Sequence, residues 1–330
     1  MSKYKESDQS RNLMILNAYY KDCQNSIGSF EKKKHVLKEK LGLLKRLLKD
    51  IINIRKVGAK KVGLKIHAFF NPKLIKDYEL EYSYDHSSEI NYVSYNEKPC
   101  GRIAVYTSIF GGYDSVLEPL YVSDLCDYYI ITDQEVPENS VWKKISLDYI
   151  AGFNEMDNYH KAKYCKLMPH VLFKEYEQSI WVDGNVQIVA DVVPLVDRLR
   201  EDHMMGTFQN PVHNCIYTEA KFLIYLDAVD YNQITNQLEV YRDEGFPKNF
   251  GMREFSIIVR KHMHDDCIIL MEQWWRQVNT HTMRDQISFP YVLWKSGKSI
   301  DYIQLLGANW RHNPRFNYFT HNWRVKFVHK

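Results

Sequence analysis

The residues whose types are best suited to bind a ligand or a metal ion follow an apolar run at Ser179–Val182. That run ends on Asp183, Gly184 and Asn185. Because strand side chains alternate with a period of two, Asp183 and Asn185 can project to the same side, while Gly184 leaves room for a pyrophosphate. Hard cations such as Mg²⁺ or Mn²⁺ take carboxylate, carbonyl and phosphate oxygens and can neutralise a diphosphate. The tripeptide is equally a common turn signal, so a cation site and a plain turn are both open interpretations.

A second apolar run, Ile103–Ile109, leads into Gly111 and Gly112 and then Tyr113. In open α/β sheets, ligands bind beyond the carboxyl ends of strands, and glycines let the backbone approach them closely. This segment is therefore a candidate resting place for a nucleotide. It is neither the dinucleotide fingerprint nor a P-loop, and a plain turn is the competing interpretation.

The third candidate is the pair Asp285 and Gln286, in the first turn of a helix predicted over 285–295. The helix dipole favours a carboxylate at that position, so capping would explain Asp285. The same turn is also a place from which a carboxylate or amide can face a cleft. Several segments bear histidines that are, taken singly, more typical of surface or core positions than of metal sites: 210–219, 260–264, 310–314 and His321.

The elements that must hold these residues alternate between strands and helices. Strand-like runs at 103–109 and 128–132 are followed by helical patterns at 161–173, 217–229 and 267–279. Strands separated by helices indicate an α/β fold with a largely parallel sheet. Residues 101–330 are long enough for a single catalytic domain of this class.

The N-terminal region has a different character, and residues 10–56 are predicted to be helical. Leu41, Leu44 and Leu48 recur at spacings of three and four, which places them on one helical face. Between residues 31 and 61, twelve lysines and arginines stand against three acids, a net charge of +9. Three interpretations are open: a helix docked on its own domain, a self-associating helix forming a homodimer, and a basic amphipathic helix on an anionic membrane surface.

The sequence thus divides into a basic helical extension at 1–60, a linker or irregular subdomain at 61–100, and the α/β domain at 101–330. The net charge of the chain is +3, which does not indicate a nucleic-acid partner. No secretory signal is evident in residues 1–30, and no apolar run reaches the ~18 residues of a membrane span. We therefore expect a cytoplasmic protein, with peripheral attachment to the inner membrane face as an option.

Seven short motifs occur in order within residues 101–296, and together they are far more specific than any one alone: Tyr106–Asp114, Ile131–Asp133, Lys163 and Lys166, Trp181–Asn185, Cys215–Glu219, Gln237–Gly245 and Arg284–Phe289. This set resembles a glycosyltransferase-like family long catalogued as a domain of unknown function. The family includes plant proteins linked to mucilage and proteins of bacterial polysaccharide loci.

The resemblance implies a GT-A fold, with a Rossmann-like nucleotide half and a D-x-D-type metal motif at Asp183 to Asn185. The family is distantly similar to the family-8 retaining transferases, whose later D-Q element corresponds to Asp285 and Gln286. One departure is that Asn185 stands in place of the second acid. Cation binding would then lean on a third ligand, for which His312 and His321 are the candidates.

By this resemblance, the protein transfers a sugar from a nucleoside-diphosphate donor, most simply a UDP-sugar, to a glycan or lipid-linked glycan with help from Mn²⁺ or Mg²⁺. The expected roles are nucleoside binding by Thr107, Tyr113 and Asp133, diphosphate binding by Lys163, Lys166, Asp183 and Gly184, catalysis by Arg284, Asp285 and Gln286, and acceptor or sugar contact by His213 and Glu219. Two alternatives from other classes are a metal-dependent hydrolase and a non-catalytic glycan-binding scaffold. The sequence leaves the stereochemical outcome open.

Overall fold

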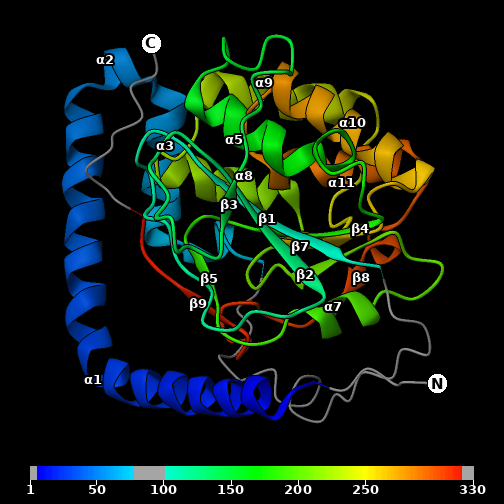
Figure 1. The fold of residues 1–330 in the computed structure, drawn as a ribbon. Coiled ribbons are helices and arrows are strands. Elements are labelled where there is room, and N and C mark those ends of the chain that lie inside the picture. Colours follow the sequence, from blue (N-terminus) through cyan, green and yellow to red (C-terminus); the bar gives the residue numbers. More distant parts are fainter. Residues whose placement is uncertain (1–5, 78–100, 322–330) are drawn as a thin grey trace.

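A seven-stranded, mostly parallel sheet forms the centre of the protein, whose computed structural model describes residues 6–77 and 101–321. The strand order is β3-β2-β1-β4-β7-β6-β8, and β7 runs antiparallel to both of its neighbours. The remaining pairs are parallel. This is an α/β arrangement with a largely parallel sheet, as expected (Figure 1). The strands are β1 Ile103–Ile109, β2 Cys126–Thr132, β3 Lys143–Lys144, β4 Gln178–Val182, β6 Met205–Gln209, β7 Arg253–Arg260 and β8 Gln304–Leu305.

Both faces of the sheet are covered, which explains why every residue of β1 is buried. On one face, aromatic side chains of α10 and α11 pack on β7: Trp274 and Phe289 lie 4.8 Å from Phe255, measured between ring centroids. The other face is covered by α7 and by a small ribbon of β5 and β9. The helices of the domain are α5 Asn158–Leu167, α6 Pro169–Leu172, α7 Val193–Asp197, α8 Ile216–Tyr225, α9 Tyr231–Asp243, α10 Asp265–Thr280 and α11 Asp285–Lys295. The ribbon consists of β5 Val186–Ile188 and β9 Phe316–Tyr318.

The predicted helices occur, with differences at their ends. The segment expected as one helix over 161–173 is two, because α5 ends at Leu167 and α6 begins at Pro169. Proline has no backbone N–H to donate and disfavours helical backbone at the preceding residue. Helix α8 stops at Tyr225, earlier than predicted, and Asp227 then adopts a positive φ of 56°. The helix expected over 285–295 matches α11.

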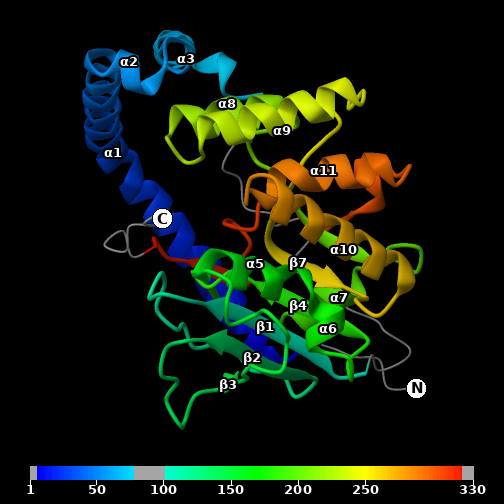
Figure 2. The same cartoon turned by 90° about the horizontal axis from the view of Figure 1, so that it is seen from above.

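The N-terminal region is a helical arm, which confirms the helix expected over 10–56. Helix α1 spans Asp8–Ile52, the short α2 spans Ile54–Val57, and α3 spans Ala59–Phe70. Figure 1 shows α1 passing below the domain and then turning to run up its left side to α2. Figure 2 shows that it reaches from the side of the sheet to the side of α8.

The first turns of α1 dock on the domain, so the interpretation of a docked helix holds for that part. The Glu6 carboxylate, just before α1, pairs with the buried Arg315 guanidinium at 2.8 Å. The Lys21 ammonium donates to the carbonyl oxygens of Asn313, at 2.5 Å, and Phe316. These contacts tie the arm to the segment that leads into β9.

The second docking point of the arm is α3, in a region predicted to be a linker. Val62 and Ala68 are buried, and the Lys65 ammonium bridges Asp50 of α1 and Asp227 beside α8, at 2.6 and 2.5 Å. Tertiary packing therefore makes this segment helical, although its sequence pattern is loose. Residues 78–100 of the predicted linker lie outside the described residues. None of the described helices is long and apolar enough to span a bilayer.

Candidate functional site

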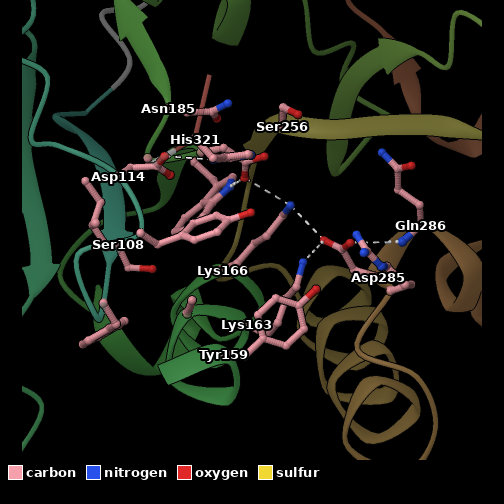
Figure 3. A pocket seen from close by; sticks show the side chains of 18 of the residues that line it. Ser108, Asp114, Tyr159, Lys163, Lys166, Asn185, Ser256, Asp285, Gln286 and His321 are labelled. Carbon is pink, nitrogen blue, oxygen red and sulfur yellow. Dashed lines mark hydrogen bonds and ion pairs between the residues drawn. The ribbon is translucent and has the colours of Figure 1, made fainter. Parts of the chain in front are cut away.

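A cavity of about 350 Å³ lies at the carboxyl ends of β1 and β4, where both turns singled out in the sequence meet (Figure 3). It is walled by the sheet on one side and by α5, α8 and the start of α11 on the other. The polar and charged side chains that line it include Ser108, Tyr113, Asp114, Tyr159, Lys163, Lys166, Asp183, Asn185, Glu219, Glu254, Ser256, Arg284, Asp285, Gln286, Arg311 and His321.

Four charged side chains of alternating sign cross this cavity. The Lys166 ammonium lies 3.3 Å from Asp183 Oδ1 and 2.8 Å from Asp285 Oδ2, and the Lys163 ammonium lies 3.0 Å from the same Asp285 oxygen (Figure 3). We call this row the charge chain. It joins the turn after β4 to the start of α11 through the two lysines of α5.

The charge chain fixes the ionisation of its buried members. Burial lowers the pKa of Lys166, but the Asp183 and Asp285 carboxylates raise it by more, so the ammonium stays protonated. Burial raises the pKa of Asp285, yet Lys163 and Lys166 together hold it well below its usual range. At neutral pH both groups are therefore charged.

Local structure explains how α5 presents its two lysines. Asp157 caps the helix by accepting hydrogen bonds from the backbone N–H groups of Tyr159 and His160. Lys163 and Lys166 are three residues apart and therefore share one helical face. At the other end of α5, the fully buried Arg260 guanidinium donates to the Lys166 carbonyl at 2.7 Å.

Asp285 does more than begin a helix. Its Oδ1 accepts a hydrogen bond at 3.2 Å from the N–H of Gln286, while its Oδ2 faces the two lysines. The N-cap residue of α11 is Arg284, whose side chain makes no capping bond and instead donates to the Ala228 carbonyl at 3.2 Å. A local helical role thus accounts for only one Asp285 oxygen.

The turn after β1 forms the other end of the cavity. Asp133 accepts a hydrogen bond at 2.7 Å from the N–H of Gly111 and so supports the turn without lining the cavity. Tyr113 lines it, and its ring stacks on the His321 ring at 4.5 Å. His321 also pairs with Asp114 at 2.8 Å. Thr107 is buried within β1, outside the lining.

Asp183 and Asn185 both line the cavity, as their spacing predicted. Asp183 Oδ1 accepts from the Trp181 indole N–H at 2.7 Å, and Asn185 Nδ2 donates to the Phe319 carbonyl at 3.0 Å. The second Asp183 oxygen and the Asn185 amide oxygen are the ligand atoms suited to a hard cation. A Cβ at Gly184 would meet Ile109 at 2.7 Å, so close packing on β1 explains that glycine.

These ligands suit a cation that also binds substrate phosphates. Magnesium is commonly held by one or two carboxylates together with phosphate oxygens and water. Within the described ranges, no three His, Cys, Asp or Glu side chains gather as a metal-binding group. His312 lies outside the cavity lining, and burial with the nearby Lys21 and Arg311 charges lowers its pKa to about 4. Of the two histidines considered as a third ligand, His321 is the one that lines the cavity.

Glu219 of α8 forms an ion pair with His213, which lies on the side of α8 away from the cavity. Glu219 lines the cavity, and its carboxylate contacts Nδ1 of His213, which is buried outside the lining. His213 Nε2 donates to the Ile75 carbonyl at 2.7 Å, at the end of the N-terminal arm. Burial lowers the pKa of His213, but Glu219 raises it by more, so the net shift is upward. His213 therefore supports Glu219 from behind.

Sequence reasoning missed the contribution of β7. Glu254 and Ser256 line the cavity, and Glu254 lies 3.4 Å from the Arg311 guanidinium. The Ser256 carbonyl also accepts a hydrogen bond from the N–H of Asp183 at 2.8 Å. A glutamate and a serine two positions apart in a buried strand share one face, and that spacing was the signal available in the sequence.

Comparison with known proteins supplies one family and one curated relative. The family model described as "TOD1/MUCI70, glycosyltransferase-like domain" matches residues 85–306. The "Probable hexosyltransferase MUCI70" of Arabidopsis thaliana is 24% identical over 220 residues, which is 59% of this chain and 38% of that protein. This chain thus covers well under half the length of the plant relative.

Two solved glycosyltransferases align with the chain at low scores. The "WbbM bifunctional glycosytransferase" has a TM-score of 0.37 at 10% identity, over 66% of this chain and 41% of its own. The mannosyltransferase Ktr4p of S. cerevisiae has a TM-score of 0.29 at 10% identity, over 69% of this chain and 72% of its own. These scores are too low to transfer a site from either structure.

The His213–Glu219 pair predicts a pH-dependent stability. Because the folded-state pKa of His213 is raised above 6.5, the stabilisation is fully present below that pH and is lost as pH rises through the folded pKa. We expect His213→Gln to lower the free energy of unfolding by about 1.5–3 kcal/mol at acidic pH, and by progressively less toward alkaline pH. Urea unfolding between about pH 5.5 and about pH 8.5 measures this trend. His67→Gln, at an exposed position of α3, is the matched control, and a penalty of His213→Gln that grows with pH would contradict the assignment.

Proposed function

The chain belongs to the TOD1/MUCI70 glycosyltransferase-like family, and from this membership we propose that it transfers a sugar from a UDP-linked donor to a hydroxyl group of a glycan. A hexosyl unit is the first expectation, because the plant relative is named a probable hexosyltransferase. A glycan or lipid-linked glycan is the corresponding acceptor. The observation that carries the proposal is the charge chain at the carboxyl ends of two parallel strands, where α/β sheets bind their ligands.

The donor diphosphate would lie beside Lys166 and Lys163. Departure of a nucleoside diphosphate builds negative charge on its phosphate oxygens, and fixed cations in a site with little water stabilise that charge. Lys166 is buried and already held between two carboxylates, so little reorganisation is needed to present its ammonium group. The stacked Tyr113 and His321 rings offer an aromatic surface for the base at the opposite end of the cavity.

Asp183 and Asn185 would hold a divalent cation together with the diphosphate. When bound, Mn²⁺ or Mg²⁺ would supply additional positive charge to the leaving diphosphate. The Trp181 indole N–H donates a hydrogen bond to one oxygen of Asp183, and this bond orients the carboxylate. Because the described residues offer only these two ligands, with His321 nearby, we propose that cation binding depends on the nucleotide.

Asp285 would act as a fixed negative charge beside the anomeric carbon. Its pKa lies well below its usual range because Lys163 and Lys166 outweigh its burial, so it is a weak proton acceptor. A fixed carboxylate suits the stabilisation of an oxocarbenium-like transition state. Gln286 follows it along the same wall, and Glu219 of α8, which also lines the cavity, would hold a sugar or acceptor hydroxyl.

The donor site is tested by isothermal titration calorimetry with UDP, GDP and CDP, each with and without Mn²⁺. We expect UDP to bind best, Mn²⁺ to strengthen its binding, and Mn²⁺ without nucleotide to give no measurable heat. Asp183→Ala should weaken UDP binding in the presence of Mn²⁺ by roughly tenfold or more, the loss typical of one charge-assisted contact. Asp243→Ala, an exposed substitution on α9, is the control. Binding of no nucleotide would overturn the proposal and favour a hydrolase or a scaffold.

The role of Asp285 is tested by Asp285→Asn, which keeps the shape of the side chain and removes its charge. We expect kcat for donor consumption to fall by roughly a hundredfold or more, because fixed charges at a transition state have effects of this size. Asp265→Asn is a matched control, since Asp265 is the first residue of α10 as Asp285 is of α11. A lower melting temperature with unchanged kcat would show that Asp285 serves only the helix.

A further inference from the structure

The second half of α1 exposes a continuous apolar stripe. Leu41, Leu44, Leu48, Ile51 and Ile52 are all exposed, and Ile52 retains 82% of its accessible surface. Their spacings of three and four residues place them along one side of the helix, because successive helical residues turn by ~100°. Isolated exposed leucines are ordinary, but five on one helical stripe are not.

The stripe is held outward by the packing of the rest of the helix. Leu47 is buried, and Asp50 is paired with Lys65 of α3 at 2.6 Å. Lys65 also contacts Asp227 beside α8, so this end of α1 is anchored to the domain. The face of α1 toward α3 is therefore occupied, and the apolar stripe is left on the surface.

Exposed cations that form no ion pair adjoin the stripe. Lys45 and Lys49 of α1 lie on the flank of the stripe, and Arg55 and Lys56 are exposed on the adjoining α2. None of these four forms an ion pair with an acid in the part of the chain that the structure describes. The nearest acid of α1, Asp50, is already engaged by Lys65.

We propose that this face, formed by the stripe and its four cations and here called the 41–56 face, binds the surface of a bilayer containing anionic lipids. Apolar side chains on one side of a helix insert at the boundary between headgroups and acyl chains, while adjoining lysines and arginines are attracted to anionic headgroups. The membrane would thus be recognised by charge and apolar area together. This inference goes beyond the proposed transfer reaction and does not rest on it.

A second copy of the chain suits this face less well. Coiled coils use acids beside the seam to pair with lysines, and the described part of this face offers four cations and no unpaired acid. Charge complementarity therefore favours an anionic lipid surface over a like-charged partner.

The proposal is tested by flotation of the full chain with vesicles of phosphatidylcholine alone and of phosphatidylcholine with phosphatidylglycerol. We expect binding to the anionic vesicles, weakening with added salt, and little binding to the neutral ones. Lys45→Gln, Lys49→Gln and Lys56→Gln combined should lower the partition coefficient roughly a hundredfold, at about fivefold for each cation. Leu48→Gln with Ile52→Gln should also lower it, since both side chains are exposed.

The matched control combines Lys174→Gln, Lys221→Gln and Lys248→Gln, three exposed lysines elsewhere on the domain. Equal loss of binding in this control would overturn the proposal, because net charge alone would then explain the attraction. Absence of vesicle binding, together with a doubled solution mass that Leu48→Gln abolishes, would instead assign the face to self-association. UDP titration of each variant reports separately on the donor cavity, so failure of one proposal does not imply failure of the other.

Discussion

An ammonium group buried between two carboxylates is the constraint on which the site depends. Lys166 has little contact with solvent, and a buried charge is tolerated only when opposite charges compensate it. Its partners come from different elements: Asp183 follows β4, and Asp285 begins α11. The helices must therefore pack on the sheet in the one arrangement that brings these three side chains together. The buried Arg260 of β7 supports this arrangement, because it donates a hydrogen bond to the Lys166 carbonyl near the end of α5.

The N-terminal arm connects the two sides of the same cavity. Near its start, Glu6 and Lys21 hold the segment that continues through β9 to His321, at the Tyr113 end. Near its end, the Ile75 carbonyl accepts from His213, which supports Glu219 on the α8 side. The arm thus helps to hold the site together, although its sequence pattern alone is also typical of an amphipathic helix that does not contact the domain.

Local pattern predicted the α/β class, strand β1 and helix α11, because these elements are specified by continuous apolar runs and by helical periodicity. It also placed Asp183, Asn185 and Asp285 correctly at the ends of elements. It did not single out α9 or the strands β6 and β7. It did not predict that Lys166 joins Asp183 to Asp285, since these residues lie far apart in sequence and meet only through packing. It also missed Glu254 of β7, although its spacing from Ser256 was a signal, and it assigned the segment of α3 to a linker.

The most direct measurement of the central claim compares the dissociation constants of UDP and uridine for the wild-type chain and for Lys166→Met. Their ratio isolates the contribution of the diphosphate from that of the base and ribose. If Lys166 is the diphosphate's buried cation, UDP binds wild type much more tightly than uridine, and Lys166→Met reduces that preference by roughly tenfold or more while uridine binding is retained. A UDP preference over uridine that Lys166→Met leaves unchanged would contradict the account and separate the charge chain from donor binding.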